Sequence, residues 1–252
     1  GRQAYCDAAL AQGREIGNWE YWSWITWRQK NPDPLAIFDL SYGENSTTLA
    51  ILYDLLHAEL SETDRRHFQH IATRRSFDPF LQHTRQDASH QPAWWFGHRQ
   101  SNWNTVCAGG AGMLALAMED DLPQAATVLQ RVETSIAPYM LELRKTRGAW
   151  PEGLGYWNYG MRYGFMYLLS RENATRRRHP LLRQNATRQT LQFPLDFCPH
   201  GVSCSFGDVN HWRPMPFHLA VAERLGLPDL TTTLIRQIVA QPPQPTAKGW
   251  PD

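Results

Sequence analysis

The chain has 252 residues, of which 25 are Lys or Arg and 24 are Asp or Glu, so its formal net charge is +1. A chain of this length can bury a sizeable core in one or two domains, and the balanced charge argues against nucleic acid as the main partner. No stretch approaches the roughly 20 apolar residues that a membrane-spanning helix needs, so no such helix is expected.

Helical periodicity dominates the sequence. A capping box at Ser61 and Asp64 predicts the start of one helix. Pro138 is expected to kink another helix or end it early. Asp78-Pro79 marks either a kink or the start of a new helix. The other predicted helices cover residues 4–15, 19–29, 45–60, 105–119, 123–145, 159–170, 216–225 and 229–240.

Only residues 191–198 and 202–206 have an extended pattern, and residues 171–188 are expected to form a polar connection without function. The predicted fold is therefore all-α, built of helical hairpins, with one domain over 1–240 and an extended, Pro-rich tail over 241–252. Residues 105–119 are apolar nearly all round, which predicts an internal helix whose glycines allow close backbone approach.

Metal ions and cofactors are not expected, because the sequence contains neither CxxC nor HExxH, and a serine nucleophile is unsupported without GxSxG. Cys198 and Cys204 could form a disulfide in an oxidising compartment, but partly buried, reduced thiols are the favoured interpretation.

Two segments, residues 94–110 and 148–160, combine indoles, amides and phenols with turn residues, as a sugar-binding cleft requires. An aromatic-rich core is the alternative explanation for the eleven Trp residues. The residues predicted to bind sugar are Trp94, Trp95, Trp103, Asn104, Trp150, Trp157 and Asn158.

Five residues in these segments are candidates for chemistry: Asn102, Tyr156, Tyr159, His98 and Glu152. An amide can donate hydrogen bonds to a substrate carboxylate, and a phenol or imidazole can move a proton. Each also has a structural alternative: Asn102 or Asn104 can cap the helix that follows, the phenols can pack under the loop, and His98 and Glu152 can be ordinary polar residues.

The motifs NWNxVCxGG (residues 102–110) and WPEGxGYWNYG (residues 150–160) resemble the heparinase II/III-like polysaccharide lyases, specifically their N-terminal helical domain. Asp39-Leu40, Tyr53-Asp54, Leu60-Ser61-Glu62 and, more loosely, Phe206-Gly207-Asp208 extend the resemblance over roughly residues 35–215.

The resemblance implies an incomplete (α/α) toroid and β-elimination of acidic, uronate-containing polysaccharides by a periplasmic or secreted protein. It assigns carboxylate neutralisation to Asn102 and proton transfer to Tyr156, with Tyr159 as second choice. The chain departs from the family in having Trp103 where several lyases have His. It also ends at Asp252 without the covalently linked β-sandwich domain of the family, so we expect a fragment.

Two other functions remain open at this stage. A glycoside hydrolase would pair Glu152 with Asp39, Glu44 or Asp208 across a cleft. A non-catalytic domain that binds acidic glycans would keep the cleft without the chemistry.

Overall fold

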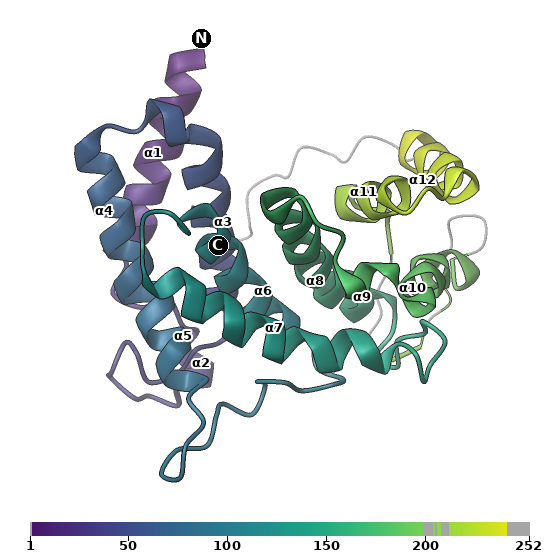
Figure 1. The fold of residues 1–252 in the computed structure, drawn as a ribbon, viewed down its shortest axis with the longest axis horizontal. Coiled ribbons are helices and arrows are strands. Elements are labelled where there is room, and N and C mark those ends of the chain that lie inside the picture. The colour runs from purple at the N-terminus through teal and green to yellow at the C-terminus, as the bar shows by residue number, and fades with distance from the viewer. Residues whose placement is uncertain (1, 199–203, 205, 208–211, 241–252) are drawn as a thin grey trace.

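The computed structural model describes residues 2–198, 204, 206–207 and 212–240, and within them the protein is all-α, without β-strands. In order, the helices are α1 (Arg2–Asn18), α2 (Ile25–Arg28), α3 (Leu40–Leu56), η1 (His57–Glu59), α4 (Glu62–Ala72), the π-helical η2 (Thr73–Phe77), α5 (Asp78–His83), α6 (Asn102–Ala117), α7 (Gln124–Glu142), α8 (Leu154–Thr175), α9 (Pro180–Arg183), α10 (Asn185–Asp196), α11 (Pro216–Arg224) and α12 (Pro228–Ala240). In Figure 1, α1 and α4 lie at the left of the view and α11 and α12 at the right, with α6, α7 and α8 between them.

Two pairs of consecutive helices pack as antiparallel hairpins. Ser46 of α3 shares a 2.8 Å hydrogen bond with Ser76 of η2, which continues α4. Asn104 at the start of α6 bonds Ser135 near the end of α7. These contacts join early residues of one helix to late residues of the next, as antiparallel packing requires.

The helices α3, α6 and α8 instead run parallel. Along α6 and α8, Asn102 faces Gly160 and Gly112 faces Tyr167, so the residue numbers rise together. Along α3 and α6, the backbones nearly touch: a Cβ on Gly110 would lie 2.0 Å from the carbonyl oxygen of Gly43. Only glycine permits this approach, and it brings the N-terminal ends of the three helices to one end of the protein.

Helix α6 lies at the centre of the core, as its apolar sequence predicts. Every residue from Asn104 to Ala115 is buried. One continuous cluster of buried apolar side chains extends from Leu10 of α1 to Leu234 of α12. The sequence predicted α6 well because a helix that is apolar on all sides can be stable only inside a protein.

The capping box at Ser61 is confirmed, since its side chain accepts a 3.1 Å hydrogen bond from the backbone N–H of Asp64. Helix α7 continues through Pro138 to Glu142, so Pro138 does not end it early. At Asp78, α5 continues directly from η2.

The helix predicted over residues 19–29 is mostly wrong, because only Ile25–Arg28 is helical. Trp24 adopts an extended conformation, and its backbone N–H donates a 2.8 Å hydrogen bond to Asp39. The indole of Trp22 is buried and donates to the carbonyl of Ile16. These tertiary contacts fix residues 19–24 in a non-helical path.

The extended segment predicted over 191–198 is also wrong, because α10 extends to Asp196. Its buried residues, including Thr187, Thr190, Leu191 and Pro194, recur at three- and four-residue steps and so share one helix face. The expected connection over 171–188 contains the end of α8, all of α9 and the start of α10. The segment 202–206 lies partly, and the tail 241–252 entirely, outside the described residues.

None of the described helices combines the length and apolarity that crossing a membrane requires. No disulfide bond joins Cys198, which is buried, to Cys204, which is exposed.

Candidate functional site

The predicted catalytic residues lie near the N-terminal ends of α6 and α8. Asn102 is the first residue of α6, and Tyr156 and Tyr159 lie in the first two turns of α8. Glu44, near the start of α3, completes the group. Unpaired backbone N–H groups at helix N-termini make their surroundings favourable for negative charge.

Asn102 does not cap α6, contrary to one of the two interpretations of this segment. The cap is Ser101, whose hydroxyl accepts a hydrogen bond from the backbone N–H of Trp103. The side chain of Asn102 is buried against α8, where a Cβ on Gly160 would lie 3.1 Å from the Asn102 Cβ. Glycine at 160 therefore allows Asn102 to lie beside α8.

Tyr156 lies one helical turn before Gly160 and thus on the same face of α8. Because Gly160 contacts Asn102, the first residue of α6, Tyr156 lies on the face of α8 that is turned toward the N-terminus of α6. It is 36% exposed, so its ring is accessible from solvent. Asn102 and Tyr156 consequently border the same end of the α6–α8 pair.

Tyr159 is held by a carboxylate. Its phenol donates a 2.7 Å hydrogen bond to Oε1 of Glu44, and its ring packs edge-on against Tyr163 with centroids 5.6 Å apart. Burial first, and Glu44 second, raise the pKa of Tyr159 far above its ordinary value. The same two causes raise the pKa of Tyr163 to about 12. Both phenols therefore stay protonated, and the phenolate form that could accept a proton is scarce.

Asn104 is a scaffold residue. It is fully buried, and its amide nitrogen donates to the carbonyls of His98 (2.8 Å) and Ser135 (2.7 Å). Its amide oxygen accepts from the hydroxyl of Ser135 at 2.7 Å. All of these bonds join α6 to α7 and to the preceding loop, so the amide is not directed at a ligand.

Three of the tryptophans predicted to bind sugar are also buried. The indole of Trp95 donates to the carbonyl of Phe38 (2.8 Å), and that of Trp157 donates to the hydroxyl of Thr190 (2.8 Å). Trp150 packs against Tyr139 and donates to Glu152 at 3.1 Å. Their ring faces belong to the core.

Four neighbouring rings form a row at the surface, which we call the aromatic row: Trp27, Trp103, Trp94 and His98. Ring centroids of Trp27 and Trp103 are 5.1 Å apart, as are those of Trp103 and Trp94, and the His98 ring lies 5.8 Å from Trp94. Trp27 and Trp94 are exposed and Trp103 is half-buried. Sequence reasoning missed Trp27, because only the fold brings α2 beside α6.

The remaining polar candidates are dispersed. Glu152 is half-buried and accepts from Trp150, while Oδ1 of Asn158 is buried without a hydrogen-bond partner in the described part of the chain. Asp39 is fully buried and caps α3, and burial raises its pKa to about 6 against the opposing backbone N–H groups. Asp208 lies outside the described residues.

Two hollows open along other parts of the parallel helices. One of about 430 Å³ lies between the C-terminal halves of α3, α6 and α8, and another of about 480 Å³ lies between α8 and α11. Met113 and Ser170 line both. Neither is lined by Asn102, Tyr156 or Tyr159. Among the described residues, no three His, Cys, Asp or Glu side chains gather as a metal site would require.

Comparison with known proteins supplies no family: no protein-family model matches this sequence, and no curated protein is significantly similar to it.

Proposed function

We propose that the protein is the helical domain of a polysaccharide lyase that cleaves uronate-containing glycans by β-elimination. The observation that supports this most is the contact between Asn102 and Gly160, because it brings the amide-bearing residue Asn102 beside the α8 face to which Tyr156 belongs. The resemblance of the two motifs to heparinase II/III-like lyases points to the same residues.

The proposed chemistry begins at the uronate carboxylate. The proton at C5 of a uronate is weakly acidic while the adjacent carboxylate is charged, and its removal produces an enolate-like anion. The Asn102 amide, assisted by the positive end of α6, stabilises that developing charge. One well-aimed donor of this kind contributes about 3 kcal/mol to transition-state stabilisation.

Tyr156 is the proposed proton-transfer group. Its phenol is accessible, whereas the phenol of Tyr159 is engaged by Glu44 and has a raised pKa. Tyr156 acts as the phenolate: it takes the C5 proton and becomes a phenol, and this phenol then protonates the leaving oxygen and returns to the phenolate, unless a second phenol supplies that proton. Tyr159 then serves to fix α8 against α3. Substrate sugars stack on the aromatic row beside this end of the protein.

The larger assembly is part of the proposal. The parallel α3, α6 and α8, of which α3 and α6 are each followed by an antiparallel partner, are compatible with an incomplete (α/α) toroid. A β-sandwich domain on the full-length protein would cover the N-terminal ends of α6 and α8 and supply further catalytic groups.

Product analysis tests the function directly. Full-length protein incubated with alginate, hyaluronan or heparan-type glycans should release unsaturated oligosaccharides that absorb in the near ultraviolet. Saturated reducing ends would instead indicate hydrolysis and would refute the lyase proposal.

A second candidate is a glycan-binding domain without catalytic activity. The exposed aromatic row favours it, because stacking on sugar requires no catalytic phenol. Binding of acidic glycans by the full-length protein, with neither unsaturated nor saturated products after long incubation, would select this candidate.

A further inference from the structure

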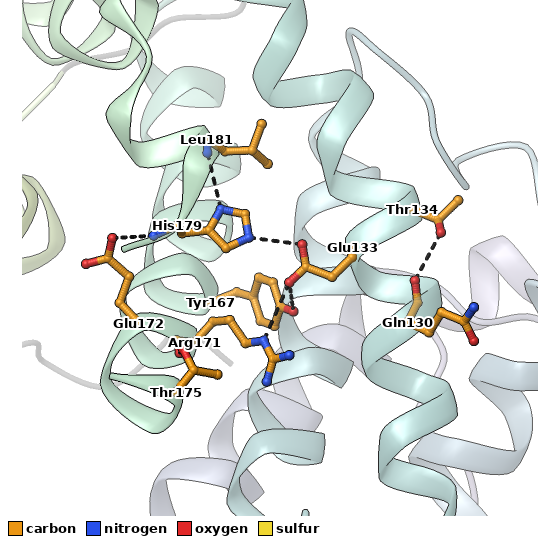
Figure 2. A network of polar contacts seen from close by, with 9 residues as sticks. All are labelled: Gln130, Glu133, Thr134, Tyr167, Arg171, Glu172, Thr175, His179 and Leu181. Carbon is orange, nitrogen blue, oxygen red and sulfur yellow. Dashed lines mark hydrogen bonds and ion pairs between the residues drawn. The ribbon is translucent and has the colours of Figure 1, made fainter. Parts of the chain in front are cut away.

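A basic pocket lies where α8 ends and the chain turns into α9, against α7. It has a volume of about 560 Å³. Its lining residues are Glu133, Arg171, Thr175, Arg177, Arg178, His179 and Pro180. Figure 2 shows the polar network at its base, in which Glu133 lies between the phenol of Tyr167, the ring of His179 and the guanidinium of Arg171.

The single acidic residue of this pocket is already engaged. Glu133 accepts hydrogen bonds from the phenol of Tyr167 at 2.6 Å and from Nε2 of His179 at 3.0 Å. Burial acts to raise the pKa of Glu133, but these two bonds and Arg171 outweigh it and hold the pKa below its ordinary value. Both carboxylate oxygens therefore face protein donors, as Figure 2 shows.

Both ring nitrogens of His179 are already engaged within the protein. Its Nδ1 accepts from the backbone N–H of Leu181 at 3.3 Å, so the ring proton lies on Nε2, which faces Glu133. Glu172 is not available to balance the arginines either. It is buried, and its oxygens accept from the backbone N–H of His179 and from Arg224.

The arginines retain unused donors. Nε of Arg171 is 3.8 Å from Glu133, which is an ion pair but too long for a hydrogen bond. Arg178 donates from Nη1 to the carbonyl of Arg224 at 2.8 Å, and its other N–H groups can still donate to a ligand. Arg177 has neither an ion pair nor a hydrogen bond within the part of the chain that the structure describes. Three guanidinium groups thus border one engaged carboxylate.

We propose that Arg171, Arg177 and Arg178 bind a tetrahedral oxyanion, a sulfate or phosphate group. Guanidinium groups present paired N–H donors that match two oxygens of such a group, and the excess positive charge attracts it. Thr175 also lines the pocket, but its hydroxyl donates to the carbonyl of Arg171 at 2.7 Å, so the arginines are the donors for the anion. On α8, Arg171 follows Tyr156 by 15 residues (171 − 156), or roughly 22 Å at 1.5 Å per residue. This oxyanion site is therefore separate from the proposed catalytic end and does not depend on lyase activity.

Calorimetric titration with inorganic sulfate and with inorganic phosphate, at constant ionic strength set with chloride, tests the oxyanion site. Arg177→Gln should weaken the binding of at least one of these anions about tenfold, since one charged hydrogen bond is lost. Arg171→Gln combined with Arg177→Gln should abolish it. Arg66→Gln is the matched control, because Arg66 lies on α4 and, among the described residues, forms an ion pair only with Glu62, at 3.7 Å. Melting temperatures confirm that each variant is folded.

Competition identifies the source of the oxyanion. Displacement of the inorganic anion by a sulfated glycan, but not by its desulfated counterpart, would assign the site to glycan sulfate groups. Failure of both to compete would assign it to a free anion. Absence of binding beyond that of chloride, or equal binding by wild type and the Arg177→Gln variant, would overturn the proposal.

Discussion

The phenol of Tyr159 and the carboxylate of Glu44 join α8 to α3 through a hydrogen bond between residues 115 positions apart in sequence. This bond separates the two candidate phenols by role, because it engages Tyr159 and leaves Tyr156 accessible. Tyr156→Phe should therefore reduce turnover by about 10²–10⁴-fold while glycan affinity stays nearly constant, since only one hydroxyl is removed. Steady-state rates and equilibrium binding measure the two effects.

Tyr159→Phe is the paired variant. It should lower the free energy of unfolding by about 1.5–3 kcal/mol, because a buried hydrogen bond to a carboxylate is lost, and it should retain most turnover. Loss of turnover in Tyr159→Phe with a fully active Tyr156→Phe would reverse the assignment. Full activity in both would exclude a mechanism based on these phenols.

Replacing Asn102 should mainly lower turnover, whereas replacing Asn104 should mainly lower stability. Asn104→Ala leaves the hydroxyl and carbonyl of Ser135 without their partner, so it should cost about 2–4 kcal/mol of stability. Asn102→Ala should cost less, because Ser101 caps the helix, but it should lower turnover by about 10²–10³-fold. Chemical denaturation beside kinetics separates the two; a fully active Asn102→Ala enzyme would remove Asn102 from the mechanism.

The sequence distinguished these amides poorly for a physical reason. Ser101, Asn102 and Asn104 are all good capping residues within four positions, and only backbone geometry decides which one caps. The hydrogen-bond partner of Asn104 is Ser135, 31 residues away, and no local sequence pattern indicates that these two residues meet. In contrast, α6 itself was predictable, because its uniform apolar composition constrains it to the interior.

The same reasoning explains the sites that local patterns miss. Trp150 and Trp157 occur among turn residues, as sugar-binding indoles do, yet the fold directs both rings inward. Trp27 belongs to a segment whose path is set by the hydrogen bond from Trp24 to Asp39, 15 residues away. Side-chain exposure depends on such long-range contacts, so the motifs identified the region of the candidate site better than its individual members.

Close packing of α3 against α6 predicts that replacing two different glycines of α6 and α8 by alanine has very different effects on stability. Gly110→Ala places a Cβ 2.0 Å from the carbonyl oxygen of Gly43, and backbone on both sides must move, so we expect a loss of about 3 kcal/mol or more. Gly164→Ala is the control, because its nearest contact would be 3.4 Å from a Thr105 methyl group. It should be neutral or stabilising by up to about 1 kcal/mol through helix propensity. Urea denaturation measures both, and equal stabilities would contradict this packing.

Asp39 should give stability a specific pH dependence. Burial raises its pKa from 3.8 to about 6, so its contribution to stability is complete below about pH 4 and is lost as pH rises through 6. Asp39→Asn can still accept the hydrogen bond that caps α3 but does not ionise. Wild type should therefore lose up to about 3 kcal/mol relative to Asp39→Asn between pH 4 and pH 7. Parallel stability curves over that range would show that Asp39 titrates normally.

The aromatic row yields the last prediction. Trp27→Ala and Trp94→Ala each remove an exposed ring from the row, so each should weaken acidic-glycan binding about tenfold without lowering the melting temperature appreciably. Trp19→Ala is the matched control, since Trp19 is a similarly exposed indole that has no ring contact with the row. Trp157→Phe should show the opposite behaviour, with lower stability and unchanged affinity, because its indole lies in the core and donates to Thr190. Affinity electrophoresis in glycan-containing gels measures all four variants under one condition. Unchanged mobility of both Trp27→Ala and Trp94→Ala would place glycan binding elsewhere on the protein.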